Sequence, residues 1–199
     1  MAVRSLVILP VLVLVLSGCS GEDKVESPAA AKNRAGCPSA VKPEWQRLAN
    51  RVKAPVYCPS WMPSPLDADI GGQWNSGGAL VDKDHSYLVG FLWHEAGSGD
   101  VHVNFRGYPG QTAMPRCIER RRPIPCFSDA RGTKRIGDKK VTIYTVSRDA
   151  DQWHVTYLWR RSGTLYTVSE HVAPPLTFRR VVANLDRLVR GLELIRPAA

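Results

Sequence analysis

The stretch that decides the fold is the C-terminal third, which contains three short runs of strand-forming residues: Val141-Thr-Ile-Tyr-Thr-Val-Ser147, Trp153-His-Val-Thr-Tyr-Leu-Trp-Arg160 and Thr164-Leu-Tyr-Thr-Val-Ser169. β-Branched and aromatic residues dominate each run and turn-forming residues separate them, which predicts a three-stranded antiparallel meander. Side chains two positions apart in a strand share a face. The middle run therefore places its largest side chains together: Trp153, Val155, Tyr157 and Trp159.

The segment after this meander predicts an amphipathic helix. Pro174 and Pro175 stop the sheet, and Thr177 is a suitable helix N-cap. Apolar residues then recur with the 3.6-residue period of a helix. They are Phe178, Val181, Val182, Leu185, Leu188, Val189 and Leu192. Such an apolar stripe needs a cover, and the sheet supplies it.

The residues before the meander add further strands and one short helix. We expect strands at Tyr87–Trp93 and Val101–Arg106, and a helix at Glu44–Val52. Residues 107–140 are expected to be irregular, and residues 56–66 are too rich in proline for a strand ladder. Because no βαβ alternation occurs, the fold class is α+β, a curved antiparallel sheet packed on a C-terminal helix.

The first eighteen residues predict a secretory leader. Arg4 precedes the apolar run Leu6–Leu16, which is too short to span a bilayer. The order Leu16-Ser-Gly-Cys19 resembles the lipobox of bacterial lipoproteins, in which small residues fit the signal peptidase and the cysteine thiol takes a diacylglycerol. The resemblance implies acylation of Cys19. It also implies a protein anchored by lipid at the outer face of the cell membrane.

Three parts of the chain follow from this leader: residues 1–18 as signal peptide, 19–36 as acylated cysteine and tether, and 37–199 as one extracytoplasmic domain. Between Ser20 and Arg34 only Val25 is a branched apolar residue, so we expect a flexible tether. The whole chain has 199 residues, 44% hydrophobic and 23% charged, which excludes a disordered or fibrous protein.

Two segments of the domain resemble an uncharacterised domain of Gram-positive lipoproteins and membrane-bound anti-sigma-type proteins. The opening Ala54-Pro-Val-Tyr-Cys-Pro-Ser-Trp-Met-Pro63 is similar to its proline-rich start. The turn Trp159-Arg-Arg-Ser-Gly-Thr-Leu-Tyr166, followed by a terminal helix, is similar to its close. That domain is LolA-like, so the resemblance implies a curved sheet that holds helices and sometimes a lipid. Because that domain has no assigned activity, the resemblance bears on the fold more than on the function.

Four cysteines remain once Cys19 is assigned to lipid, and an even number in an exported chain predicts disulfides. Four cysteines allow three pairings. We expect the local one, Cys37–Cys58 and Cys117–Cys126, because each pair brackets a proline-rich segment and closes a short loop. No pair has the spacing of a structural zinc site.

The excess of positive charge is concentrated around the second cysteine pair. The chain has 27 Lys and Arg against 18 Asp and Glu. Four arginines are candidates for contact with anionic headgroups or cell-wall polymers: Arg116, Arg120, Arg121 and Arg122. A solvated loop whose charge only maintains solubility is the alternative, and a nucleic-acid partner conflicts with the export signal.

No recognisable catalytic motif or cofactor fingerprint occurs. Ser39-Ala-Val-Lys42 matches the acylation motif of penicillin-binding proteins without its partner motifs, so it is attributed to chance. Of the five histidines, His102 and His154 lie on predicted strands opposite the apolar residues. Two of them meeting across strands would bind a metal ion, but we expect solvated imidazoles instead. The sequence thus predicts no catalytic residue, no metal ligand and no cofactor.

The function predicted from these patterns is that of a non-enzymatic binding module for a hydrophobic ligand, a lipid or an envelope protein. Five aromatic residues are candidates for an apolar pocket: Trp93, Trp153, Tyr157, Trp159 and Phe178. Their alternative role is to fill the core. Two other functions stay open, an envelope hydrolase or metal-dependent enzyme, and a sensory or structural module.

Overall fold

A computed structural model describes residues 36–66, 81–93, 101–148 and 153–198, so Cys19 and the predicted leader and tether lie outside the described residues. The elements follow in this order: α1 (Lys42–Val52), β1 (Val56–Cys58), β2 (Tyr87–Trp93), β3 (Val101–Tyr108), β4 (Arg116–Glu119), β5 (Arg122–Pro125), β6 (Phe127–Ile136), β7 (Lys139–Ser147), β8 (His154–Arg161), β9 (Thr164–His171), α2 (Phe178–Arg190) and β10 (Glu193–Ile195).

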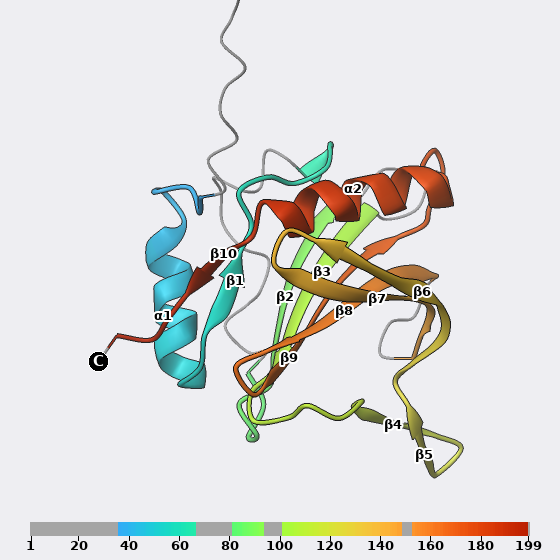
Figure 1. Ribbon diagram of the computed structural model, residues 1–199, viewed down its shortest axis with the longest axis horizontal. Helices are drawn as coiled ribbons and strands as arrows, with labels where there is room; N and C mark the ends of the chain where they lie inside the picture. The colour runs from blue at the N-terminus through green and yellow to red at the C-terminus, as the bar shows by residue number, and fades with distance from the viewer. Residues whose placement is uncertain (1–35, 67–80, 94–100, 149–152, 199) are drawn as a thin grey trace, which may run out of the picture. The chain divides into compact units, whose positions relative to one another are not determined.

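A six-stranded antiparallel sheet forms the centre, with the strand order β2-β3-β9-β8-β7-β6. The predicted meander is β7, β8 and β9. Ser162 and Gly163 both have positive φ, as a two-residue hairpin turn requires, and they pair Arg161 with Thr164. The α+β fold class is confirmed: the C-terminal helix packs on this sheet, as Figure 1 shows.

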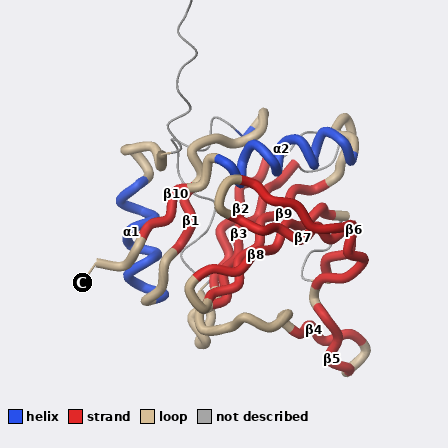
Figure 2. Tube along the Cα trace, in the orientation of Figure 1, coloured by secondary structure: helices blue, strands red, loops and turns tan. Residues whose placement is uncertain are grey.

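Helix α2 covers one face of the sheet, called the inner face here (Figure 2). Thr177 caps it as predicted, since its Oγ1 accepts a hydrogen bond from the Arg180 N–H at 3.2 Å. Most of the predicted apolar stripe is buried: Val181, Leu185, Leu188 and Val189. Polar groups fix the helix on the sheet as well, because the Tyr157 hydroxyl donates to Asp186 Oδ1 at 2.8 Å.

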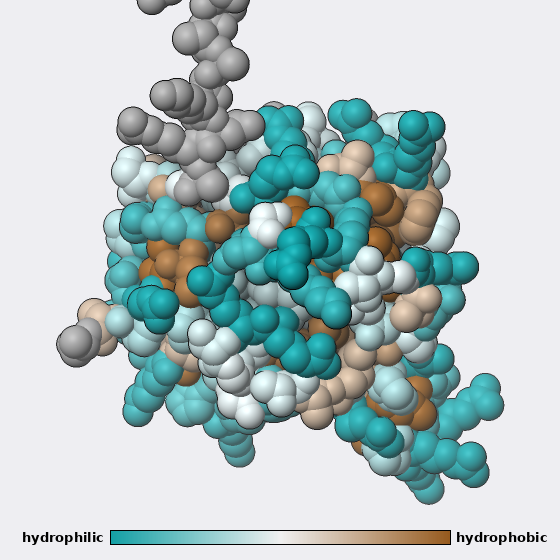
Figure 3. All heavy atoms as spheres, in the orientation of Figure 1, coloured by the Kyte–Doolittle hydropathy of each residue, from teal (hydrophilic) through white to brown (hydrophobic). Residues whose placement is uncertain are grey.

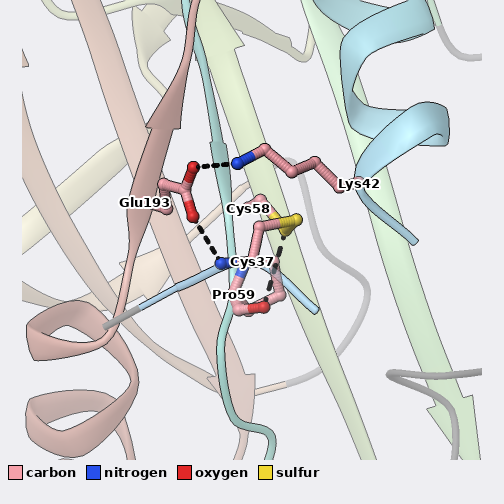
Figure 4. Close-up of a disulfide and its surroundings, with 5 residues drawn as sticks. All are labelled: Cys37, Lys42, Cys58, Pro59 and Glu193. Atoms are coloured by element: carbon pink, nitrogen blue, oxygen red, sulfur yellow. Dashed lines mark hydrogen bonds and ion pairs between the residues drawn. A yellow bond between two sulfur atoms is a disulfide. The ribbon is translucent and has the colours of Figure 1, made fainter. Parts of the chain in front are cut away.

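The first and last strands of the described chain pair with each other. Strand β1 lies antiparallel to β10, with Tyr57 opposite Leu194, and α1 packs beside this two-stranded ribbon. The disulfide Cys37–Cys58 joins the first described residues to β1 (Figure 4). Glu193 of β10 accepts a hydrogen bond from the Cys37 backbone N–H at 2.6 Å and pairs with Lys42 at 2.7 Å. The ion pair with Lys42 holds the pKa of Glu193 below its usual range.

Two sequence-based expectations were wrong. Residues 56–66 do contribute a strand, because β1 needs only three residues, Val56–Cys58, which precede the prolines that follow Cys58. Residues 107–140 are not irregular. They contain the hairpin β4–β5 and the ten-residue strand β6, whose exposed side chains gave no alternating apolar pattern. The predicted disulfide pairing is confirmed for both bonds, Cys37–Cys58 and Cys117–Cys126.

An aromatic row crosses the inner face where the register aligns Tyr87, Gly107, Tyr166 and Trp159. Tyr57 of β1 packs edge-on against both Trp159 and Tyr166, with ring centroids 5.3 and 4.8 Å apart. A glycine is needed in this row. A Cβ at position 107 would lie 2.2 Å from Cε1 of the buried Tyr87 ring.

Replacing Gly107 by alanine is expected to destabilise the domain by about 1–3 kcal/mol, the usual cost of overpacking, because Tyr87 is enclosed and has no room to move away. Chemical denaturation monitored by circular dichroism measures the loss. Gly90→Ala is the matched control on the neighbouring strand, where the nearest atom is Asn104 Oδ1 at 3.1 Å. Equal effects of the two substitutions would contradict this account of Gly107.

Candidate functional site

An open groove of about 540 Å³ lies at the edge of the inner face, beside the start of α2. Its apolar side is formed by Trp153, just before β8, and Phe178, the first residue of α2. The two rings are nearly parallel, with an interplanar angle of 12° and centroids 6.4 Å apart. Trp153 is 54% exposed and Phe178 39% exposed, so both offer apolar area to a ligand.

The other lining residues come from β6 and β7; three of them are polar, Asp129, Arg131 and Thr145, and one is apolar, Val146. Asp129 accepts a hydrogen bond from Thr145 and forms an ion pair with Arg131 at 2.9 Å. A register shift between Ala130 and Gly132 accompanies the positive φ of Asp129. Such a bulge changes the direction of side chains, which explains why residues 129 and 131 both reach the same threonine, Thr145.

The five predicted pocket residues do not line one pocket. Trp153 and Phe178 line the groove, whereas Trp93, 42% exposed at the end of β2, does not. Tyr157 and Trp159 lie in the core. Burial, and then the hydrogen bond to Asp186, raise the pKa of Tyr157. Between Trp159 and its aromatic neighbours there is no room for a water molecule.

The four predicted surface arginines do lie together. Arg116, Arg120, Arg121 and Arg122 are exposed on the hairpin β4–β5, which the disulfide Cys117–Cys126 joins to the start of β6. Arg120 and Arg121 form its tip, both with positive φ. Ile118 is 73% exposed beside them. Figure 3 shows this region, at the lower right, as largely hydrophilic with a hydrophobic patch among the charged atoms.

Three histidines meet on the opposite, outer face of the sheet, one from each of the neighbouring strands β3, β9 and β8. Nε2 of His102 lies 2.6 Å from Nε2 of His154. The His171 ring centroid is 4.9 Å from that of His102 and 5.4 Å from that of His154. His154 is only 1% exposed, so the expectation of a solvated imidazole was wrong for this residue.

The strand register explains this meeting. His154 pairs directly with His171 across β8 and β9, and β3 lies on the other side of β9. The next pair on the same face is Thr156 and Ser169, both buried. The hydroxyl of Thr156 has no hydrogen-bond partner among the described residues. The outer face thus carries a buried polar region that the apolar core does not explain.

Glu170 is a further buried polar residue that the sequence patterns did not single out. It lies on the inner face between Val103 and Val155 and accepts a hydrogen bond from Asn184 of α2 at 2.8 Å. Its other oxygen, Oε2, has no partner among the described residues. Burial raises the pKa of Glu170 to about 7.

Other sites considered from the sequence have structural explanations. Lys42 of the Ser39–Lys42 motif pairs with Glu193, so it is engaged in holding the chain ends together. In the part of the chain that the structure describes, no group of three or more His, Cys, Asp or Glu side chains could hold a metal ion with the side chains in their present positions. The helices within the described ranges also include none with the length and apolar character to cross a bilayer.

Replacing Glu170 by glutamine is expected to remove a pH dependence of stability. A carboxyl whose pKa is raised by folding stabilises the protonated fold. The free energy of unfolding of the unmodified protein should therefore fall between pH 4.5 and 7, by about 1.4 kcal/mol per pH unit and about 3 kcal/mol in all. Urea denaturation at a series of pH values measures this slope, which Glu170→Gln should flatten.

Glu193→Gln is the matched control with the opposite sign, because the pKa of Glu193 is lowered. The native carboxylate stabilises the fold above the unfolded pKa, and that advantage over the variant should vanish as the pH falls. A slope unchanged by Glu170→Gln would contradict the assignment of a buried, neutral carboxyl.

Comparison of the chain with family models, curated proteins and solved structures gave no match in any of the three. The chemistry of the groove, the hairpin and the histidine cluster therefore has to be inferred from their own geometry.

Proposed function

We propose that the protein is a lipid-anchored extracytoplasmic binding module, without catalysis of its own, that holds an amphiphilic ligand in the Trp153–Phe178 groove. The observation that carries this proposal is the pair of parallel, solvent-exposed rings opposite a charged wall. Large exposed apolar side chains that face a concave surface are typical of ligand sites.

The two sides of the groove suit the two parts of an amphiphile. The apolar part of the ligand would pack on Trp153 and Phe178 and bury the exposed apolar surface of both rings. Its polar part would face Asp129 and Arg131, which already neutralise each other in an ion pair. A zwitterionic or uncharged headgroup therefore fits this wall better than a strongly anionic one.

The leader and the disulfides together support the proposed location. The lipobox-like order ending at Cys19 supports acylation, and two disulfides support an oxidising compartment outside the cytoplasm. The LolA-like resemblance agrees with a lipid as ligand. The filled aromatic core favours binding at the open groove over binding inside the fold, as far as the described residues extend.

A lysophosphatidylcholine with a brominated acyl chain tests the groove, because bromine quenches the fluorescence of a tryptophan that it contacts. The chain from residue 19 with Cys19→Ser provides protein without an acyl group. We expect saturable quenching, and Trp153→Ala should weaken binding about tenfold or more, since a buried aromatic ring contributes roughly 1.5–3 kcal/mol.

Trp93→Ala is the matched control, because Trp93 is similarly exposed but does not line the groove. It should leave both affinity and most of the quenching unchanged. Quenching that survives Trp153→Ala, or disappears with Trp93→Ala, would refute the groove as the binding site.

The basic hairpin favours a second role, contact with an anionic surface. Its tip presents Arg120 and Arg121 beside the exposed Ile118, which combines charge with one apolar side chain. Each arginine near an anionic bilayer contributes about 1 kcal/mol. On a protein already held by lipid, this hairpin would orient the domain against the headgroups.

Sedimentation with vesicles of phosphatidylglycerol and phosphatidylcholine tests this role, again with the chain from residue 19 and Cys19→Ser. The double substitution of Arg120 and Arg121 by glutamine should weaken binding to the anionic vesicles roughly thirtyfold at low salt. Arg179 and Arg190, exposed on α2, are the control pair of equal charge. Equal losses from both pairs would mean that only net charge matters.

A further inference from the structure

We propose that His102, His154 and His171 form a binding site for a divalent first-row transition-metal ion, of which Zn²⁺ is the representative. This site lies on the outer face of the sheet and is independent of the proposed groove. Three imidazoles with no carboxylate or thiolate among them suit Zn²⁺, Cu²⁺ or Ni²⁺, and do not suit Ca²⁺ or Mg²⁺, which prefer oxygen ligands.

Two ring nitrogens of the cluster approach each other closely. At 2.6 Å, Nε2 of His102 and Nε2 of His154 can share only one hydrogen, so one of them presents a lone pair to the other. A lone pair on a neutral imidazole is what a transition-metal ion binds. Tetrahedral Zn²⁺ places two such nitrogens about 3.3 Å apart, given Zn–N bonds of about 2.0–2.1 Å. Separating the two rings by less than about 1 Å would make room for the ion.

His171 is the candidate for the third ligand. Its ring lies within 5.4 Å of both others, on the strand between theirs in the sheet. For His171 to join the site, its side chain would have to turn so that a ring nitrogen faces the same point as the Nε2 atoms of His102 and His154. The proposed site thus needs two side-chain adjustments, a small separation of the His102 and His154 rings and a turn of the His171 ring.

The backbone makes this arrangement rigid. All three residues belong to adjacent strands of the central sheet, and His154 and His171 are directly paired in the ladder. Ligands on such strands need little ordering when the ion binds, which favours affinity. Three neutral ligands also leave a fourth position open for water. The buried hydroxyl of Thr156, one residue pair further along the same face, is a candidate partner for that water.

The alternative is an imidazole cluster that only exchanges protons within itself. It would have the same distances between rings, but it would take up no metal. Since only a metal site takes up the ion, titration with the metal alone distinguishes the two possibilities.

Isothermal titration of Zn²⁺ into the chain from residue 19 tests the proposal, with Cys19→Ser removing the remaining thiol that would itself bind zinc. We expect one ion per chain, bound with the loss of any proton that the coordinating nitrogens carry. Nitrogen-15 NMR of the histidine rings should show shifts of three rings on addition of Zn²⁺. Absence of stoichiometric uptake, or uptake that shifts other histidines, would overturn the site.

Substitutions then identify the ligands. His102→Gln changes the most accessible member of the cluster and should lower the affinity more than tenfold, and His171→Gln should do the same. His85→Gln is the matched control, because His85 lies on an exposed turn with Asp82 and Asp84, where a cation would also find ligands. Binding that depends on His85 and survives both cluster variants would refute the proposal, and the wild-type NMR shifts decide it if a variant fails to fold.

Discussion

The structure depends on the burial of one apolar stripe of α2 against the inner face of the sheet. Four side chains of this stripe are almost completely removed from water: Val181, Leu185, Leu188 and Val189. Burying a valine or leucine contributes about 1.5–3 kcal/mol, so the stripe as a whole exceeds any single polar contact in the domain. One polar pair interrupts it, Asn184 with Glu170. This hydrogen bond fixes the position of the helix along the sheet, because any shift would leave two polar side chains buried without their hydrogen-bond partners.

Since the inner face is filled by α2 and by the aromatic row, the features that suggest function lie around this core. The groove lies at the start of α2, where the first residue of the helix, Phe178, stacks beside Trp153. The basic hairpin is attached through a disulfide. The histidine cluster uses the outer face, where a smaller apolar cluster around Phe127 and Leu158 leaves space for polar residues.

Much of the fold was predictable from local patterns, and the failures have physical causes. The alternation in β8 and β9 and the helical period after Thr177 predicted the meander and α2, because those residues pack on a single core. Strand β6 was missed because its side chains are mostly exposed and carry no apolar alternation. The pairing of β1 with β10 joins residues far apart in sequence, and nothing local marks such a contact.

The candidate sites differ in the same way. The two-residue turn at Ser162-Gly163 fixes the register of β8 and β9, so the pairing of His154 with His171 was within reach of the sequence. The third histidine was not, because β3 joins β9 across the sheet without being its neighbour in the chain. Glu170 and Asn184 did leave a signal: each is a polar residue at an apolar position of its strand or helix. The separation of Trp153 from Tyr157 and Trp159 depends on how α2 lies on the sheet, which periodicity alone does not give.

The disulfide between Cys37 and Cys58 has a mechanical consequence. A force that pulls on the chain at residue 36 acts next on Cys37. The disulfide transmits that force to Cys58 in β1, which is paired with β10. Helix α1 lies within the loop that this disulfide closes, so the force would not act along the helix. A pull from the N-terminal side would therefore leave α1 folded.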